Sequence, residues 1–379
     1  MDFQLTEEHL AVQEAARDFA QTELLPGVIE RDEKQEFPAQ QVKKMGELGF
    51  MGMMVSPEYG GGGMDTKSYV LAIEEISKVD ASASVCMSVN NSLVCWGIEE
   101  YGTEEQKQKY LPELASGRLL GAFCLSEPEA GSDATMQRTS ALDHGDYYLV
   151  NGSKNWITNG NSASIYLIMG QSEAEKKHKG INALIVEKEW EGFVVGKKEN
   201  KMGIRASDTH SLMFNDLKVP KPNRIGEDGF GFRFAMSVLN GGRIGIAAQA
   251  LGIASGAYER SVQYAKERKT FGQEISKHQA IQFKLAEMAT KIDAARLLCF
   301  QAADLKDKGQ SYIKESAMAK LYASQVAMEV TIEAVQIHGG YGYVKEYHVE
   351  RMMRDAKVTQ IYEGTSEIQK LVIAREILK

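Results

Sequence analysis

The hydrophobic spacing along this chain changes twice, and those changes constrain its fold more than any other feature. Apolar residues follow helical spacing in residues 1–120, short strand-like runs replace them in residues 121–225, and long helical patterns return in residues 226–379. This order predicts an α+β fold, mostly α, with an N-terminal helical domain, a middle β domain and a C-terminal helical bundle. A chain of 379 residues is long enough for two or three such domains.

The helical zones carry recognisable start and stop signals. Thr6 is a natural N-cap for a first helix that should end at Leu25-Pro26-Gly27, and Thr103 with Gln106 fits a capping box. In the last zone, apolar residues in steps of four and three place one stripe along a long helix, which predicts the seam of an antiparallel bundle. The members of this stripe are Ile281, Leu285, Met288, Ile292, Ala295, Cys299 and Ala302.

The middle zone is typical of short strands. The run 147–150 leads directly into Asn151-Gly152, a strong hairpin signal, so we expect a turn there. Several short strands at this spacing predict a small antiparallel barrel or sandwich. Further runs, each bounded by Gly, Asn, Asp or Pro, occur at 165–169, 181–186, 193–195 and 212–214.

The composition excludes several classes of protein. Acidic residues outnumber basic ones by 52 to 44, and a net charge of -8 is the opposite of what a nucleic-acid binder needs. The apolar runs are too short to cross a bilayer and residues 1–5 show no secretory pattern, so we expect no membrane span and a location in the bacterial cytoplasm or, after processing, an organelle matrix. Four cysteines without a C-x-x-C pair and seven scattered histidines predict no metal site. P-loop and strand-linked G-x-G-x-x-G motifs are absent from the sequence.

Two segments of the middle zone have the chemistry of a ligand site. Residues 123–133 concentrate hydroxyls, backbone amides and a glycine in one turn, which suits an anionic or heteroaromatic ligand, although a plain polar loop would look the same. Residues 154–160 could place an indole ring and a hydroxyl on one wall of a pocket. A hairpin with a core tryptophan would look alike.

Two further segments lie in the C-terminal zone. Residues 336–342 end a long helix with three glycines in four residues, where one would suffice as a C-cap, so the others predict a backbone lying against a ligand such as a phosphate. Residues 361–367 lie in a short connector, in which Glu363 would ordinarily be an exposed acid near a helix N-terminus. Its apolar neighbours Ile361 and Tyr362 argue against that interpretation.

Five short patterns from these regions occur in order in this one chain: Leu-Ser-Glu-x-x-x-Gly-Ser-Asp, Trp-Ile-Thr-Asn-Gly, Arg-x-x-Phe-Gly, Gln-Ile-x-Gly-Gly and Ile-Tyr-Glu-Gly-Thr. Together they resemble the acyl-CoA dehydrogenases, and among these most closely the short-chain, butyryl-CoA type. The resemblance implies a C-terminal four-helix bundle, one FAD per subunit, a homotetramer, a short-chain acyl-CoA substrate, and electron-transfer flavoprotein as the electron acceptor.

The resemblance also implies roles for individual residues. The cofactor-binding residues would be Phe123, Leu125, Ser126, Gly131, Ser132, Trp156, Ile157, Thr158, Arg268, Phe271, Gln279, Gln336, Gly339, Gly340, Thr365 and Glu367. The members of this set from Arg268 to Gly340 would hold the pyrophosphate and adenosine across a subunit interface. The substrate-binding residues would be Ser132, Asn240, Arg243, Tyr362 and Gly364.

Glu363 matches the catalytic base of the family. Oxidation of an acyl thioester requires loss of a weakly acidic proton from the α carbon and of a hydride from the β carbon. Removal of water as the ligand enters should raise the pKa of this carboxyl and strengthen it as a base, while the nearby helix N-terminus would act oppositely. Some relatives take their base from a position near Gly242, but residues 240–243 contain no acid here.

Two alternatives to a dehydrogenase stay open from the sequence. One is an acyl-CoA oxidase that uses O₂, and the other is a non-catalytic flavoprotein that acts as a scaffold or a DNA-associated factor. Two positions depart from the family pattern, because Asn240 stands where many relatives have Asp and Met136 replaces a usually small residue.

Overall fold

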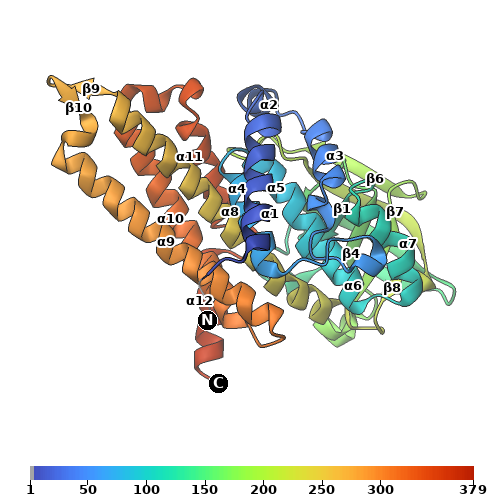
Figure 1. The fold of residues 1–379 in the computed structure, drawn as a ribbon. Coiled ribbons are helices and arrows are strands. Elements are labelled where there is room, and N and C mark those ends of the chain that lie inside the picture. Colours follow the sequence, from blue (N-terminus) through green and yellow to red (C-terminus); the bar gives the residue numbers. More distant parts are fainter. Residues whose placement is uncertain (1–3) are drawn as a thin grey trace.

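The elements follow one another in the order that the hydrophobic spacing predicts, helical, then β, then helical again (Figure 1). The structure, a computed structural model, describes residues 4–379. Thr6 caps the first helix by accepting a hydrogen bond from the His9 amide, and both bonds of the Thr103–Gln106 capping box are formed, as predicted. The N-terminal helices are α1 (Glu7–Phe19), α2 (Val28–Lys34), α3 (Ala39–Glu47), α4 (Thr66–Ser77), α5 (Ala81–Ser88), α6 (Trp96–Tyr101) and α7 (Glu104–Ala115).

The middle unit is an open sheet rather than a closed barrel. Its strands lie in the order β6-β7-β3-β2-β4-β5-β8, with β1 beside β4. Only the pair Ser140 and Gln171 joins β2 to β4, so the sheet divides into two halves, which is the sandwich alternative. Two pairings, β1 with β4 and β2 with β4, are parallel, which corrects the expectation of a wholly antiparallel unit. The strands are β1 (Gly121–Cys124), β2 (Ser140–Asp143), β3 (Tyr147–Thr158), β4 (Ile165–Gln171), β5 (Ile181–Glu187), β6 (Phe193–Lys198), β7 (Thr209–Pro220) and β8 (Arg224–Ile225).

The hairpin turn expected at Asn151-Gly152 is wrong. Strand β3 continues without interruption through these residues, and its register with β7 shifts there, which marks a β-bulge. The Asn151 side chain exchanges two hydrogen bonds with Asp216 of β7, at 3.0 and 2.8 Å, and Asp216 has a φ of 51°. A Cβ at Gly152 would lie 2.7 Å from the Cα of Thr139, the residue before β2, so the glycine is required by this close approach instead of by a turn.

The C-terminal unit is built on long helices. Helices α8, α9 and α10 pack on one another, and the shorter α11 and α12 pack on α10. The predicted seam of α9 is buried from Met288 to Ala302, and burial raises the pKa of the Cys299 thiol, so this cysteine belongs to the core as expected. The bounds are α8 (Gly231–Glu267), β9 (Lys269–Thr270), β10 (Gln273–Glu274), α9 (Gln279–Asp307), α10 (Ile313–His338), α11 (Val349–Val358) and α12 (Ser366–Ile377).

Among residues 4–379, no helix is both long enough and apolar enough to cross a bilayer.

Candidate active site

Glu363 lies on the tight turn between α11 and α12. Glu363 has a φ of 51° and Gly364 a φ of 95°, so two consecutive residues are left-handed, which only the glycine adopts without strain. The turn is held through its carbonyl groups. Lys320 of α10 donates from Nζ to the Gly364 oxygen at 2.5 Å, and Gln369 donates from Nε2 to the same oxygen at 2.8 Å and to the Glu363 oxygen at 3.3 Å.

Glu363 is half-buried, and one of its carboxyl oxygens lacks a hydrogen-bond partner. Its Oε2 is buried, and among the described residues no hydrogen-bond donor reaches it. The backbone of α8 passes directly beside it, because a Cβ at Gly242 would lie 2.2 Å from Oε2. Burial raises the pKa of Glu363 to about 7, against the charges of Lys320 and Arg243, which act to lower it. A carboxyl with a pKa near neutrality is suited to act as a general base.

The residues expected to bind substrate gather on α8 and on the same turn, with one exception. Arg243 is buried, donates from Nη1 to the Asn240 Oδ1 at 2.7 Å, and has its pKa lowered to about 10 by burial. The Tyr362 hydroxyl donates to the Gln249 Oε1 of α8. Ser132, the exception, is exposed on the loop that follows β1.

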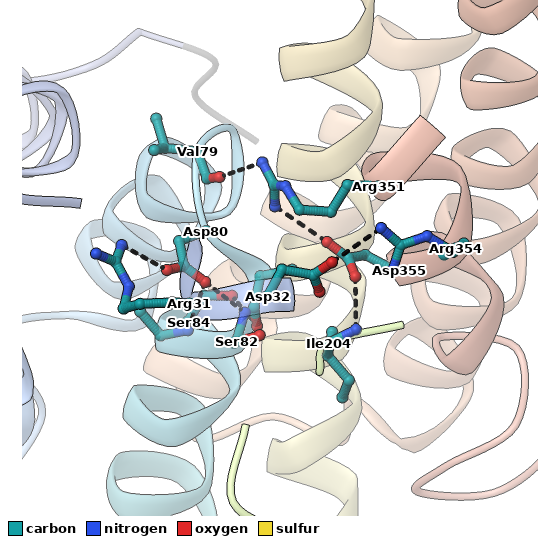
Figure 2. A network of polar contacts seen from close by, with 12 residues as sticks. Arg31, Asp32, Val79, Asp80, Ser82, Ser84, Ile204, Arg351, Arg354 and Asp355 are labelled. Carbon is teal, nitrogen blue, oxygen red and sulfur yellow. Dashed lines mark hydrogen bonds and ion pairs between the residues drawn. The ribbon is translucent and has the colours of Figure 1, made fainter. Parts of the chain in front are cut away.

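A buried charge network fixes the helix that leads into this turn (Figure 2). Asp355 of α11 accepts a hydrogen bond from the Ile204 amide of the middle unit at 2.5 Å and pairs with Arg351 at 3.1 Å. Arg351 also donates to the Val79 carbonyl at 2.8 Å, and Arg354 pairs with Asp32 of α2 at 2.9 Å. Helix α11 is therefore tied at once to the N-terminal helices and to the middle sheet unit.

The first set of expected cofactor residues lies on β1, the loop after it, and the end of β3. The Asn155 amide donates to the Ser126 carbonyl at 2.9 Å, which places the loop against β3. Next to this contact the Trp156 ring is 61% exposed at a φ of 62°, a large apolar surface left without cover. Phe123 and Ile157 are buried, Leu125, Ser126 and Thr158 are half-buried, and Gly131 is exposed with nothing within 4 Å of a Cβ added to it.

A buried ion pair that the sequence interpretation missed holds this loop in place. Glu127 accepts from the Lys154 Nζ at 2.7 Å and from the amides of Arg138 and Thr139 at 2.6 and 3.1 Å. Lys154, itself fully buried, donates also to the Leu125 carbonyl at 3.1 Å. Glu127 lies inside the first quoted pattern and Lys154 lies two residues before the second, where a charged residue beside apolar strand residues was the available signal.

The second set of expected cofactor residues is exposed at the far end of the C-terminal unit. Phe271, on the β9–β10 hairpin, is 96% exposed, and the Arg268 guanidinium lies 5.4 Å from the Tyr341 ring centroid. Gly339 and Gly340 have nothing within 4 Å of an added Cβ, and Gln279 and Gln336 are exposed.

The two sets lie far apart in the molecule. In Figure 1 the β9–β10 hairpin is at the upper left and strand β1 is in the right half, with helices of the C-terminal unit and α1 between them. Thr365 and Glu367 stand apart from both sets at the start of α12, where the Thr365 hydroxyl accepts from the Ile368 amide at 3.4 Å. One chain thus brings Glu363, Asn240, Arg243, Tyr362 and Gly364 together, but not the two halves of the expected cofactor site.

Each set nevertheless has the surface that FAD requires. An exposed indole ring beside a glycine-containing loop suits a flat heteroaromatic ring, and an exposed guanidinium with two open glycines suits a pyrophosphate. The residues present therefore fit this cofactor.

Comparison with known proteins agrees with this geometry. Models of the N-terminal, middle and C-terminal domains of acyl-CoA dehydrogenase match residues 6–118, 122–217 and 229–378. The chain is 52% identical to "Acyl-CoA dehydrogenase, short-chain specific" of Clostridium acetobutylicum, over 100% of both chains.

Solved structures agree as well. Butyryl-CoA dehydrogenase from Megasphaera elsdenii is 48% identical with a TM-score of 0.98, over 100% of both chains. A chain of the structure reported as "Electron transferring flavoprotein of Acidaminococcus fermentans: Towards a mechanism of flavin-based electron bifurcation" is 51% identical with a TM-score of 0.99, also over 100% of both chains. The protein described here therefore belongs to the acyl-CoA dehydrogenase family of FAD-dependent oxidoreductases.

Proposed function

We propose that this chain oxidises short-chain acyl-CoA thioesters at the α,β bond, converting butyryl-CoA to crotonyl-CoA, with Glu363 as the base. The observation that carries the proposal is the buried, unpartnered Oε2 of Glu363 beside Gly242. The names of the relatives from Clostridium acetobutylicum and Megasphaera elsdenii support the choice of substrate.

The residues of the turn would act in two ways. Glu363 would take the α proton at its buried Oε2. The amide N–H of Glu363 has no acceptor among the described residues, so it is free to donate to the thioester oxygen, where negative charge develops as the proton leaves. The chemistry that bound FAD supplies is acceptance of the β hydride.

We propose that the cofactor is shared between subunits of a homo-oligomer, a tetramer by family resemblance. Phe123, Leu125, Ser126, Gly131, Ser132, Trp156, Ile157 and Thr158 of one subunit would hold the ring system. Arg268, Phe271, Gln279, Gln336, Gly339 and Gly340 of another would hold the pyrophosphate and adenosine. The wide separation of the two sets within one chain supports this arrangement.

We propose electron-transfer flavoprotein as the electron acceptor. The similarity to a chain of the Acidaminococcus fermentans structure supports this partner. Location in the bacterial cytoplasm stays a prediction.

Anaerobic addition of butyryl-CoA to the purified, yellow holoprotein tests the proposal. We expect the flavin to bleach, and we expect Glu363→Gln to keep its colour but to bleach at least about 100-fold more slowly, since general base catalysis contributes that much or more. Glu58→Gln, which changes an exposed glutamate of the N-terminal unit, should bleach as the parent does. Bleaching of Glu363→Gln at the parent's rate would place the base elsewhere.

Two further assays separate the alternative functions. An acyl-CoA oxidase would form peroxide in air without any partner flavoprotein. A DNA-associated factor would shift duplex DNA at low salt, where phosphate contacts are strongest.

A further inference from the structure

Lys320 is a fully buried lysine for which the reaction described above has no use. It lies on α10 at 0% exposure, among the buried residues Ala317, Ala319 and Ala323 of the same helix. Within the described chain its Nζ makes one hydrogen bond, to the Gly364 carbonyl at 2.5 Å, and no carboxylate is within ion-pair distance. A lysine side chain is rarely buried without a paired acid, so its position calls for an explanation.

Lys320 donates its hydrogen bond to Gly364, the residue that follows Glu363. The turn has two consecutive left-handed residues, and the carbonyl between Gly364 and Thr365 is its point of attachment to α10. Gln369 donates to the same carbonyl from α12, so the oxygen is held from two helices. Only Lys320 brings a positive charge to that contact.

Several charged groups act on Lys320. They are the half-buried Glu363 on the turn, the buried Arg243 on α8 and the exposed Glu367 on α12, and burial lowers the pKa of Lys320 to about 7. The charges of Lys320 and Arg243 both act to lower the pKa of Glu363, and the effect of Lys320 is the larger. Because the pKa values of the acid and the lysine both fall near 7, each group depends on the protonation of the other.

Two more titratable groups complete the surroundings. Tyr69 of α4 interacts electrostatically with Glu363, although its hydroxyl is bonded to Ser88 at 3.0 Å. Arg375 of α12 acts on Arg243. Neither donates a hydrogen bond to the turn, which leaves Lys320 as the cation attached to it.

We propose that Lys320 is a positioning residue for the base, because its ammonium group fixes the Gly364 carbonyl and favours ionisation of the neighbouring Glu363 carboxyl. This inference rests on the proposed function, since Lys320 acts only through Glu363. A carboxylate beside a cation ionises at lower pH than the same carboxylate alone. Without the cation, Glu363 should therefore ionise at higher pH, and a smaller fraction of the Glu363 carboxyl should be ionised at pH 7.

Four variants of the holoprotein separate the charge of Lys320 from its hydrogen bond. Lys320→Met removes both, Lys320→Gln keeps a donor without the charge, and Lys320→Arg keeps the charge. Ser324→Ala is the matched control, because Ser324 is a buried residue one turn further along α10 whose hydroxyl bonds only within the helix. Thermal unfolding and flavin absorbance report whether each variant folds and binds FAD.

The first readout is the protonation of Glu363 itself, without substrate. The infrared band of the protonated carboxyl is identified as the one that Glu363→Gln lacks, and it is followed as the pH is raised. We expect the band to disappear about one pH unit higher in Lys320→Met and in Lys320→Gln than in the parent. Lys320→Arg and Ser324→Ala should match the parent.

The second readout is the rate of anaerobic flavin bleaching by butyryl-CoA at different pH values. The rise of this rate with pH should shift in the same direction, so that both neutral variants are about fivefold slower at pH 7 and recover above pH 9. If Lys320→Met, or Lys320→Gln where the methionine variant does not fold, keeps the parent's infrared titration and pH profile, the inference is wrong. If the parent itself does not bleach, the proposed function fails, whereas the infrared titration still decides the role of Lys320.

Discussion

Glu363 is held in a state that costs the folded chain stability. Its Oε2 is buried with no donor in the described structure, and its backbone is left-handed. Burial of a carboxyl without a partner is unfavourable, and a non-glycine residue at positive φ adds strain of about 1 kcal/mol. Such costs are concentrated at functional sites, where an unsatisfied group is available to the substrate.

The pH dependence of stability should report this cost. The pKa of Glu363 is raised from 4.5 to about 7 on folding, so between these values the folded chain keeps a proton that the unfolded chain has lost, and stability falls as the pH rises. At pH 8 the penalty is roughly 3 kcal/mol. Glu363→Gln should therefore unfold at a higher temperature than the parent at pH 8, with the difference shrinking at pH 5. A constant difference across this range would contradict the raised pKa.

Gly242 gives a second test at the scale of one residue. A Cβ there would lie 2.2 Å from the Glu363 Oε2 and 2.7 Å from the Leu93 Cδ2, so Gly242→Ala should displace the carboxyl and slow flavin bleaching by at least about tenfold while FAD stays bound. The adjacent Gly241→Ala is the control, because its Cβ would meet nothing closer than 3.8 Å. Equal rates for the two variants would mean that the carboxyl does not need its place beside α8.

Helices of this chain were predictable where the signal is local. The caps of α1 and α7 and the buried seam of α9 depend on residues three or four positions apart, and all three were correct. The prediction of a turn at Asn151-Gly152 was wrong. Strands β2 and β7, from other parts of the chain, flank this dipeptide, and it forms a bulge within β3 instead.

The sequence also indicated the motif segments of the site but not what holds them. Lys154 and Lys320 were missed because a buried lysine is explained only by partners that the sequence does not place beside it. Those partners are Glu127, 27 residues from Lys154, and the Gly364 carbonyl, 44 residues from Lys320.

The charge network of α11 should be a large contributor to stability. Burial raises the pKa of Asp355 to about 6, and above that pH its carboxylate balances the buried Arg351. Asp355→Asn leaves that guanidinium without its acid and should cost about 3 kcal/mol at pH 5. The cost should be smaller at pH 8, because the raised pKa of Asp355 makes the parent alone lose stability as the pH rises. The control Asp293→Asn breaks an exposed pair with Arg296 and should cost below about 0.5 kcal/mol. Thermal unfolding of both variants measures the difference, and equal midpoints would contradict it.

At the scale of the whole molecule, the separation of the two sets of proposed cofactor residues bears on how many chains a working site needs. One set lies on the middle unit, and the other lies on the β9–β10 hairpin and the end of α10 (Figure 1). Each site would then combine the turn of one chain with the hairpin of another, as closed symmetric assemblies permit.

Mixing two inactive chains tests this arrangement. Glu363→Gln damages only the catalytic turn, and Arg268→Ala combined with Phe271→Ala damages only the hairpin end. When the two chains are co-expressed, a mixed pair should contain one intact site of two, so we expect up to about half of the parent's bleaching per mixed pair and none from either chain alone. No recovery in purified mixed oligomers would show that each site belongs to a single chain.

The distance from hairpin to sheet has a genetic consequence. If subunits share the cofactor as proposed, a lesion at Phe271 would leave the chain that carries it with its own Glu363 intact and would disable the site of its neighbour instead. In a cell that makes both normal and altered copies, such a lesion would silence healthy polypeptides, whereas a second, different lesion on the other copy could restore part of what was lost.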